Sequence, residues 1–263
     1  MEYTRMEAAR RYASRGQNSV SGWLAVTAAR TIITLADVQE HLGIEGAACE
    51  IGVYYGRLFI LLCTLLRTEE RAFGIDLFEQ APDSEYGLPT RAHVFASLGR
   101  HGIAPQRVSL MACDSMTLRA IDVKSAVGAV RLFSVDGGHT AENAAHDLDI
   151  AADSVCEGGL VILDDFFNPQ WPGVAEGTCR FMAKTSGALS PVAIAGSRFI
   201  FARGDAEPYR RSLIGKESTV FGQRVITVPE PTMRTRLMGT ALWREIRSRP
   251  VGHIARRALQ WLP

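Results

Sequence analysis

The sequence lacks the features of a chain that is cross-linked, built around zinc or embedded in a membrane. Its 263 residues include only five cysteines, and no two of them form a Cys-x-x-Cys pair. This indicates neither a disulfide framework nor a zinc cluster, and we interpret the cysteines as residues of a reducing compartment. The longest apolar run, Leu58–Leu66, is far too short to cross a bilayer. The N-terminus carries charges and no apolar signal segment, so we expect a cytoplasmic protein without a transmembrane segment.

An excess of charge of one sign is also missing. The chain has 29 Lys and Arg against 28 Asp and Glu, a formal net charge of +1, so we expect no nucleic-acid partner. Basic residues gather only near the end, where seven Arg and a single acid lie between Arg234 and Arg257. We interpret residues 230–263 as a basic C-terminal appendage that contacts another subunit or domain. An anionic membrane surface and a polymeric substrate are the alternatives.

What the sequence does contain is an alternation of short apolar runs with segments of helical spacing. The expected strands are Ala47–Val53, Ala72–Leu77, Arg107–Ala112, Val130–Val135, Leu160–Leu163, Arg198–Ala202 and Gln223–Val228. The expected helices include Leu58–Arg67, Pro89–His101, Ala141–Val155 and Gly173–Thr185. This alternation predicts an α/β domain with a doubly wound, mostly parallel sheet of seven strands.

The two ends of this pattern need separate treatment. Residues 1–45 precede the first strand, and we expect them to form a helical cover. The last two runs, Arg198–Ala202 and Gln223–Val228, are not separated by an obvious long helix. We therefore expect them to be an antiparallel pair at one edge of the sheet. Ligands of such sheets bind beyond the carboxyl ends of the parallel strands, so the residues that end each run are the candidates for function.

A glycine loop follows the first expected strand. In Glu50-Ile51-Gly52-Val53-Tyr54-Tyr55-Gly56, the first glycine allows a tight turn and the second allows a ligand to approach the backbone. The loop is not a P-loop, because no Lys-Ser/Thr follows, and it is one glycine short of the dinucleotide pattern. A ligand with a ribose but no diphosphate relaxes that demand. Asp76 ends the second strand, where a carboxylate can accept both ribose hydroxyls; helix capping is the alternative.

The third strand ends at Asp114 and Ser115, whose polar side chains could meet an adenine edge. In order and spacing, residues 45–203 resemble the class I S-adenosylmethionine (SAM)-dependent methyltransferases. The resemblance implies that Glu50, Gly52 and Gly56 hold the amino-acid part of SAM, that Asp76 holds the ribose, and that Asp114 and Ser115 hold the adenine. It also makes residues 46–229 the cofactor-binding catalytic domain.

Carboxylates cluster after the fourth and fifth strands. Asp136 ends the fourth strand, and Asp164 and Asp165 follow the fifth, so neighbouring strands would bring the three together beside the cofactor. Three such charges repel one another unless a cation neutralises them, and oxygen ligands without thiols suit Mg²⁺ or Mn²⁺. Helix or loop capping is the alternative. His139 lies on the loop that leaves the fourth strand, and we interpret it as a general base rather than a structural histidine.

This arrangement is similar to the metal site of catechol O-methyltransferase and of the macrocin-type sugar O-methyltransferases. The residue three places after the first aspartate is a lysine in the catechol enzyme and a histidine in the macrocin type, so His139 agrees with the sugar pattern, as does the Asp-Asp pair. The resemblance implies metal-dependent methylation of a sugar or glycoside hydroxyl, in which Asp136 serves both cofactor and metal sites. A phenol or catechol acceptor, a nicotinamide-dependent dehydrogenase and a non-catalytic cofactor-binding scaffold are the alternatives.

One short motif points elsewhere. Asn168-Pro169-Gln170-Trp171 imitates the Asn-Pro-Pro-aromatic motif of amino-group methyltransferases. That motif belongs after the fourth strand, where this chain has Asp136, and here the second proline is missing. We therefore interpret 166–176 as a loop over the site, in which Trp171 packs against a sugar or aromatic ring, or within the core.

Overall fold

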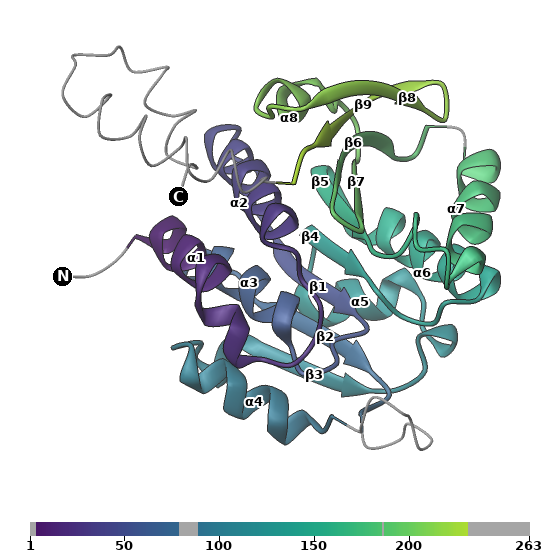
Figure 1. The fold of residues 1–263 in the computed structure, drawn as a ribbon. Coiled ribbons are helices and arrows are strands. Elements are labelled where there is room, and N and C mark those ends of the chain that lie inside the picture. Colours follow the sequence, from purple (N-terminus) through teal and green to yellow (C-terminus); the bar gives the residue numbers. More distant parts are fainter. Residues whose placement is uncertain (1–3, 79–88, 186, 231–263) are drawn as a thin grey trace, which may run out of the picture. The chain divides into compact units, whose positions relative to one another are not determined.

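The computed structural model describes residues 4–78, 89–185 and 187–230. A single sheet of nine strands runs through the centre of the described residues (Figure 1). From one edge to the other the strands are β3 (Val108–Ala112), β2 (Ala72–Asp76), β1 (Ala47–Ile51), β4 (Val130–Val135), β5 (Val155–Leu163), β7 (Arg198–Ala202), β6 (Ser190–Ala195), β9 (Gln223–Val228) and β8 (Lys216–Val220).

The first five strands of this order are parallel, and β7 enters antiparallel between β5 and β6. The strand order reverses between β1 and β4, which creates the topological switch point where ligands of such sheets bind. All residues of β1 and β4 are buried, as expected for central strands covered on both faces. The expected α/β fold with a doubly wound, mostly parallel sheet is confirmed.

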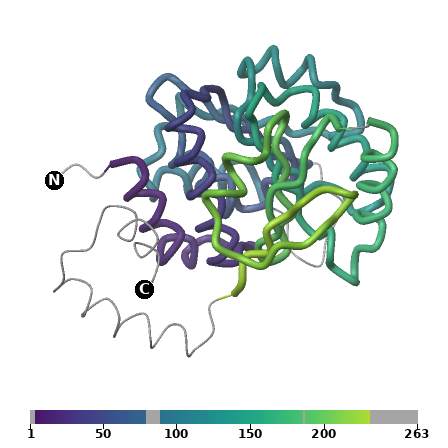
Figure 2. Tube along the Cα trace, turned by 90° about the horizontal axis from the view of Figure 1, so that it is seen from above, coloured from purple at the N-terminus to yellow at the C-terminus, as the bar shows by residue number. Residues whose placement is uncertain are grey.

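Helices cover the sheet in two groups. One contains α1 (Arg5–Ser14), α2 (Val26–His41) and α3 (Arg57–Leu65), which pack on one another and form the N-terminal cover. The other contains α5 (Ala120–Val127), α6 (Ala141–Ser154) and α7 (Pro172–Thr185). Figure 2 shows the two groups on different sides of the molecule. The remaining helices are α4 (Arg91–Arg100) and the short α8 (Glu207–Arg211). The four helices expected from the sequence are all present, with ends shifted by up to two residues.

The strand count and the edge of the sheet differ from expectation. Nine strands replace the expected seven, because β6 and β8 have no strong apolar signal: β6 contains Pro191 and small residues, and β8 is an exposed edge strand. The expected pairing of 198–202 with 223–228 is wrong, because β6 lies between β7 and β9. The fifth strand is also longer than expected and begins at Val155, directly after α6.

The chain divides into two compact units, Met1–Val228 and Pro229–Pro263. Only Pro229 and Glu230 of the second unit are among the described residues, so the basic appendage proposed from the sequence lies outside them. Within the described part of the chain, no helix combines the length and apolar character needed to cross a membrane.

Candidate active site

The glycine loop is held against the end of β4 by backbone contacts. Gly52 has φ +84°, and a Cβ at this position would overlap the carbonyl oxygen of Asp136. The Asp136 N–H in turn donates to the carbonyl oxygen of Ile51 at 2.9 Å. Gly52 is therefore required both for its left-handed backbone and for this close approach. The contact joins the two sites expected from the sequence, the cofactor loop and the acidic cluster.

Asp76 braces the same loop. Its Oδ2 accepts a hydrogen bond of 2.7 Å from the backbone N–H of Tyr54, which has φ +51°, and its Oδ1 accepts one of 3.2 Å from Phe78. Gly56, at φ +88°, is the N-cap of α3 and completes the turn. A carboxylate oxygen can accept more than one hydrogen bond, so these contacts leave Asp76 able to accept ribose hydroxyls. The expected ribose contact stays a prediction.

At the end of β3, Asp114 and Ser115 begin a short 3₁₀ turn. Asp114 caps it by accepting a 3.0 Å hydrogen bond from the Met116 N–H. Ser115 is buried, and its carbonyl oxygen lies 3.1 Å from Nε2 of His146 on α6. These contacts place both residues at the carboxyl edge of the sheet, where adenine contact stays a prediction.

A buried arginine that the sequence analysis did not consider lies among the acids. Arg198 opens β7 and is 1% exposed. Its Nη1 lies 2.7 Å from Oδ2 of Asp164 and 3.1 Å from Oδ2 of Asp136, and its Nη2 donates to the carbonyl oxygen of Trp23 at 3.2 Å. The signal that could have revealed it is an arginine at the start of an otherwise apolar strand, Arg198-Phe-Ile-Phe-Ala.

Glu50 lies close to this group and is itself 1% exposed. Its Oε2 has no hydrogen-bond partner among the residues that the structure describes. Burial and the nearby Asp136 carboxylate raise the pKa of Glu50 well above its ordinary value, against the opposing charge of Arg198. Burial also raises the pKa of Asp136 to about 7, although Arg198 acts in the opposite direction. A cationic ligand group would favour the charged form of both carboxyl groups, and the ammonium and sulfonium of SAM fit that requirement.

The side chains of Asp136, His139 and Asp165 come together. Each offers one ligand atom, and these atoms lie within 4.8 Å of one another. Oδ2 of Asp165 lies 3.4 Å from Nε2 of His139, and its Oδ1 accepts a hydrogen bond of 3.0 Å from Nδ2 of Asn168. The donor set and spacing fit a divalent cation such as Mg²⁺ or Mn²⁺. Asp164, the third ligand expected from the sequence, is instead engaged by Arg198 in this structure.

Trp171 stacks on the His139 ring, with ring centroids 4.3 Å apart and an interplanar angle of 15°. The 166–176 segment expected as a loop ends at this residue, because α7 begins at Pro172. The hydrogen bond to Asp165 raises the pKa of His139 above its ordinary value, and burial opposes this. The tryptophan and the aspartate together fix the orientation of the imidazole ring.

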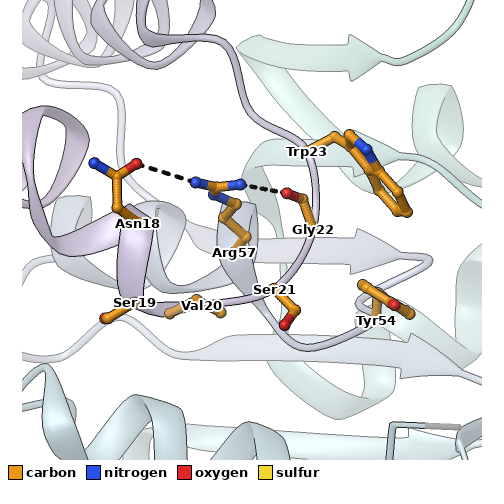
Figure 3. Close-up of a pocket in the computed structure, with 8 residues that line it drawn as sticks. All are labelled: Asn18, Ser19, Val20, Ser21, Gly22, Trp23, Tyr54 and Arg57. Carbon is orange, nitrogen blue, oxygen red and sulfur yellow. Dashed lines mark hydrogen bonds between the residues drawn. The ribbon is translucent and has the colours of Figure 1, made fainter. Parts of the chain in front are cut away.

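An open hollow of about 490 Å³ lies between the N-terminal segment and the glycine loop. Its lining, drawn in Figure 3, consists of Asn18, Ser19, Val20, Ser21, Gly22, Trp23, Tyr54 and Arg57. Trp23 stacks on Tyr54 at 5.6 Å, and Arg57 donates to Asn18 and to the Gly22 carbonyl oxygen. A smaller adjoining pocket shares five of these residues and is also lined by Glu50, Gly52, Val53, Leu58, Asp136 and Arg198. The N-terminal segment therefore forms one wall of the site, which the sequence analysis did not anticipate.

Comparisons with known proteins agree with this description. Residues 49–166 match a family model described as a methyltransferase domain. A search of curated proteins gave no match.

Among solved structures, the O-methyltransferase NovP is 18% identical over 67% of this chain and 80% of its own, with a TM-score of 0.56. CalS11, a TDP-rhamnose 3'-O-methyltransferase of calicheamicin biosynthesis, is 17% identical over 78% and 97%, with a TM-score of 0.51. An O-methyltransferase from Bacillus cereus, solved with S-adenosylhomocysteine (SAH), is 13% identical over 78% and 92%, with a TM-score of 0.50. The chain thus carries a methyltransferase domain over residues 49–166 and, with its strand order and its glycine loop at the switch point, shares the fold of these O-methyltransferases.

Proposed function

We propose that the protein transfers the methyl group of SAM to a hydroxyl oxygen of a sugar or glycoside, assisted by Mg²⁺ or Mn²⁺. The observation that carries this proposal is the meeting of two sets of residues at Asp136. Its backbone touches the cofactor loop at Gly52, and its carboxylate belongs to the cluster with His139 and Asp165. An acceptor bound at the cluster would therefore lie next to the cofactor.

SAM would be held by the residues that the resemblance assigns to it. Gly52 and Gly56 give the loop its close-approach geometry, and the buried Glu50 carboxylate can receive the ammonium group. Asp76 would hold the ribose, and Asp114 with Ser115 would hold the adenine at the end of β3. SAM supplies an activated methyl group, so the protein has to position the acceptor oxygen in line with it and remove a proton.

The metal would be bound by Asp136, Asp164 and Asp165. A bound divalent cation lowers the pKa of a hydroxyl and orients it. Asp136 and Asp165 lie close enough together for this role, and Arg198 pairs with Oδ2 of both Asp136 and Asp164. Asp165 has φ +61°, a left-handed backbone conformation that is uncommon for a residue other than glycine.

His139 would be the base that takes the acceptor proton. Asp165 lies next to Nε2, so a neutral imidazole that carries its proton there leaves Nδ1 able to accept another. The stacked Trp171 holds the ring in place. If His139 instead bound the metal, it could not act as the base. Replacing His139 with alanine separates the two roles, because loss of a ligand weakens Mn²⁺ binding and loss of a base does not.

The sugar acceptor is supported by two features of the sequence and by one structural relative. A histidine follows three residues after Asp136, and an Asp-Asp pair follows β5, as in the sugar pattern. CalS11 acts on TDP-rhamnose according to its description, although at 17% identity the similarity to it concerns the fold. A carbohydrate could also use exposed aromatic rings near the site, such as Trp23.

A screen with methyl-labelled SAM tests the proposal. The acceptors are nucleotide sugars, glycosides and catechols, each assayed with Mg²⁺, with Mn²⁺ and after EDTA treatment. We expect label in a saccharide and loss of turnover with EDTA. Turnover of catechols alone would replace the sugar assignment with the phenol type. Full turnover after EDTA would remove the metal from the mechanism. Binding of SAH without turnover of any acceptor would favour the scaffold alternative.

Calorimetric titration with SAH tests the cofactor assignment separately. Asp76→Ala should weaken SAH binding, because both the loop brace and the ribose acceptor are lost. Unchanged SAH affinity in this variant, or preferential binding of NAD by the wild type, would overturn the cofactor site.

A further inference from the structure

Arg198 occupies an unusual place in the sheet. It is the first residue of β7, and because β7 is antiparallel to β5, its beginning lies at the same edge as the carboxyl end of β5. The register pairs Phe199 with Leu163, the residue before Asp164. The topology thus brings a guanidinium directly to the edge where the carboxylates gather.

The contacts of Arg198 are with the metal-site acids. A single nitrogen, Nη1, lies within 3.1 Å of both Asp164 and Asp136. The side chain of Asp164 is only 7% exposed and that of Arg198 only 2%. A buried charge is costly unless it is paired, so the carboxylates of Asp164 and Asp136 offset the cost of burying the Arg198 guanidinium.

The two carboxylates that Arg198 engages are also among those that would bind the divalent cation of the proposed function. The Arg198 guanidinium and a metal ion are attracted by the same carboxylates. Each neutralises part of their negative charge and so weakens the electrostatic attraction between the carboxylates and the other cation. Arg198 cannot leave by diffusion, since it is part of β7, whereas a metal ion can. Arg198 therefore neutralises part of the negative charge of these carboxylates whether or not a metal ion is bound.

We propose that Arg198 is a positioning residue that acts as a built-in counter-cation, competing with the divalent metal for Asp136 and Asp164. Arg198 stabilises the folded protein when no metal is bound, and it lowers the affinity of the site for the metal. This inference rests on the metal site of the proposed function. Removal of the guanidinium should destabilise the metal-free protein and tighten metal binding.

The chain offers a matched control at the other end of β4. Arg131 is also buried, with 2% exposure, and its Nε and Nη2 each lie 2.9 Å from an oxygen of Glu70. It also donates to Gln39 and to the carbonyl oxygen of Leu65. None of these partners belongs to the metal-site cluster. Arg131→Met should therefore lower stability by a similar mechanism without changing metal affinity.

The experiment measures Mn²⁺ binding by electron paramagnetic resonance and melting temperature with and without Mn²⁺, using the full chain without SAM. Compared with wild type, Arg198→Met should bind Mn²⁺ at least about 10-fold more tightly, and Mn²⁺ should raise its melting temperature more. Arg198→Lys keeps the charge but cannot form the same fork, so its affinity should increase by a smaller factor. Arg131→Met should melt earlier and bind Mn²⁺ as wild type does.

Several outcomes would overturn the inference. These are an Mn²⁺ affinity of Arg198→Met within about twofold of wild type, an equal increase in Arg131→Met, or no Mn²⁺ binding by either the wild type or Arg198→Met. If Arg198→Met folds only with Mn²⁺ present, the inference is supported. If it does not fold at all, Arg198→Lys decides, and an unchanged affinity in that variant refutes it. Methyl transfer that survives EDTA would refute the proposed metal dependence alone, because tighter Mn²⁺ binding by Arg198→Met would still support the competition.

Discussion

Replacing Asp147 with asparagine should stabilise the protein at neutral pH. Asp147 lies on α6 and is completely buried. Its carboxylate packs against the loop that follows Asp136, where a Cβ on Gly137 would lie 2.5 Å from Oδ2. Burial raises the pKa of Asp147 to about 6, although the Ser115 hydroxyl and His146 act in the opposite direction. The charged form is therefore disfavoured in the folded protein relative to the unfolded chain.

The size of the effect follows from linkage. The pKa of Asp147 rises from an ordinary value near 3.9 to about 6. This difference corresponds to a loss of roughly 3 kcal/mol in the free energy of unfolding once the carboxyl group is ionised. Because the pKa of Asp147 is raised in the folded protein, the carboxyl group does not reduce stability below about pH 4, where it is protonated in both the folded and the unfolded protein. The loss of stability grows as the pH rises and is complete above about pH 6. Asparagine has no such titration, so Asp147→Asn should melt roughly 6–12 °C above wild type at pH 7 and close to it at pH 4.

Melting temperatures of both proteins between pH 4 and pH 8 measure this difference. Asp149→Asn is the control, because Asp149 lies on the same helix, is 40% exposed and pairs with Lys184 at 2.9 Å. The control should remain within about 0.5 kcal/mol of wild type at every pH. The reasoning fails if Asp147→Asn is no more stable than wild type at pH 7, or if its advantage does not change with pH.

Three further predictions concern the loop and the base. Gly52→Ala should abolish SAH binding in calorimetry and lower the melting temperature, because its Cβ would overlap the Asp136 carbonyl oxygen, whereas Gly99→Ala, with open space around it in α4, should leave SAH binding unchanged. His139→Ala should lose at least about 10²-fold in kcat while it keeps its SAH affinity, and a smaller loss would contradict the base assignment. In the metal-free protein, an NMR titration of His139 should have its midpoint above about 6.5, and Asp165→Asn should lower that midpoint. Since the base is active when neutral, the raised pKa moves the rise in its activity to higher pH.

The parts of the site that the sequence predicts are those that follow from parallel strands. An apolar run followed by a polar residue marks the carboxyl edge, and Asp76, Asp136 and Asp165 are found there for that reason. Arg198 could not be placed in this way, because it begins its strand instead of ending it and reaches the edge only through the antiparallel direction of β7. The sequence predicts a pairing of this strand with Gln223–Val228, whereas the strand lies beside β5.

Trp23 was missed for a different reason. It lies in the segment between α1 and α2 that was interpreted as helical cover, and nothing in its spacing marks it as part of a site. It stacks on Tyr54, which has a left-handed backbone that no residue pattern predicts. Such long-range contacts arise only once the chain has folded, so they become visible only in the structure.

Asp136 illustrates why single substitutions in this site need careful choice. Its backbone contacts Gly52, and its carboxylate contacts Arg198 and faces His139 and Asp165. An Asp136→Ala variant would therefore disturb the cofactor loop, the buried ion pair and the metal cluster together, and its loss of activity could not be assigned to one of them. Asp165 is separated from the glycine loop, and its neighbours are His139 and Asn168. Substitution of Asp165 thus tests the proposed metal and base residues, whereas substitution of Asp136 tests the connection between these residues and the cofactor loop.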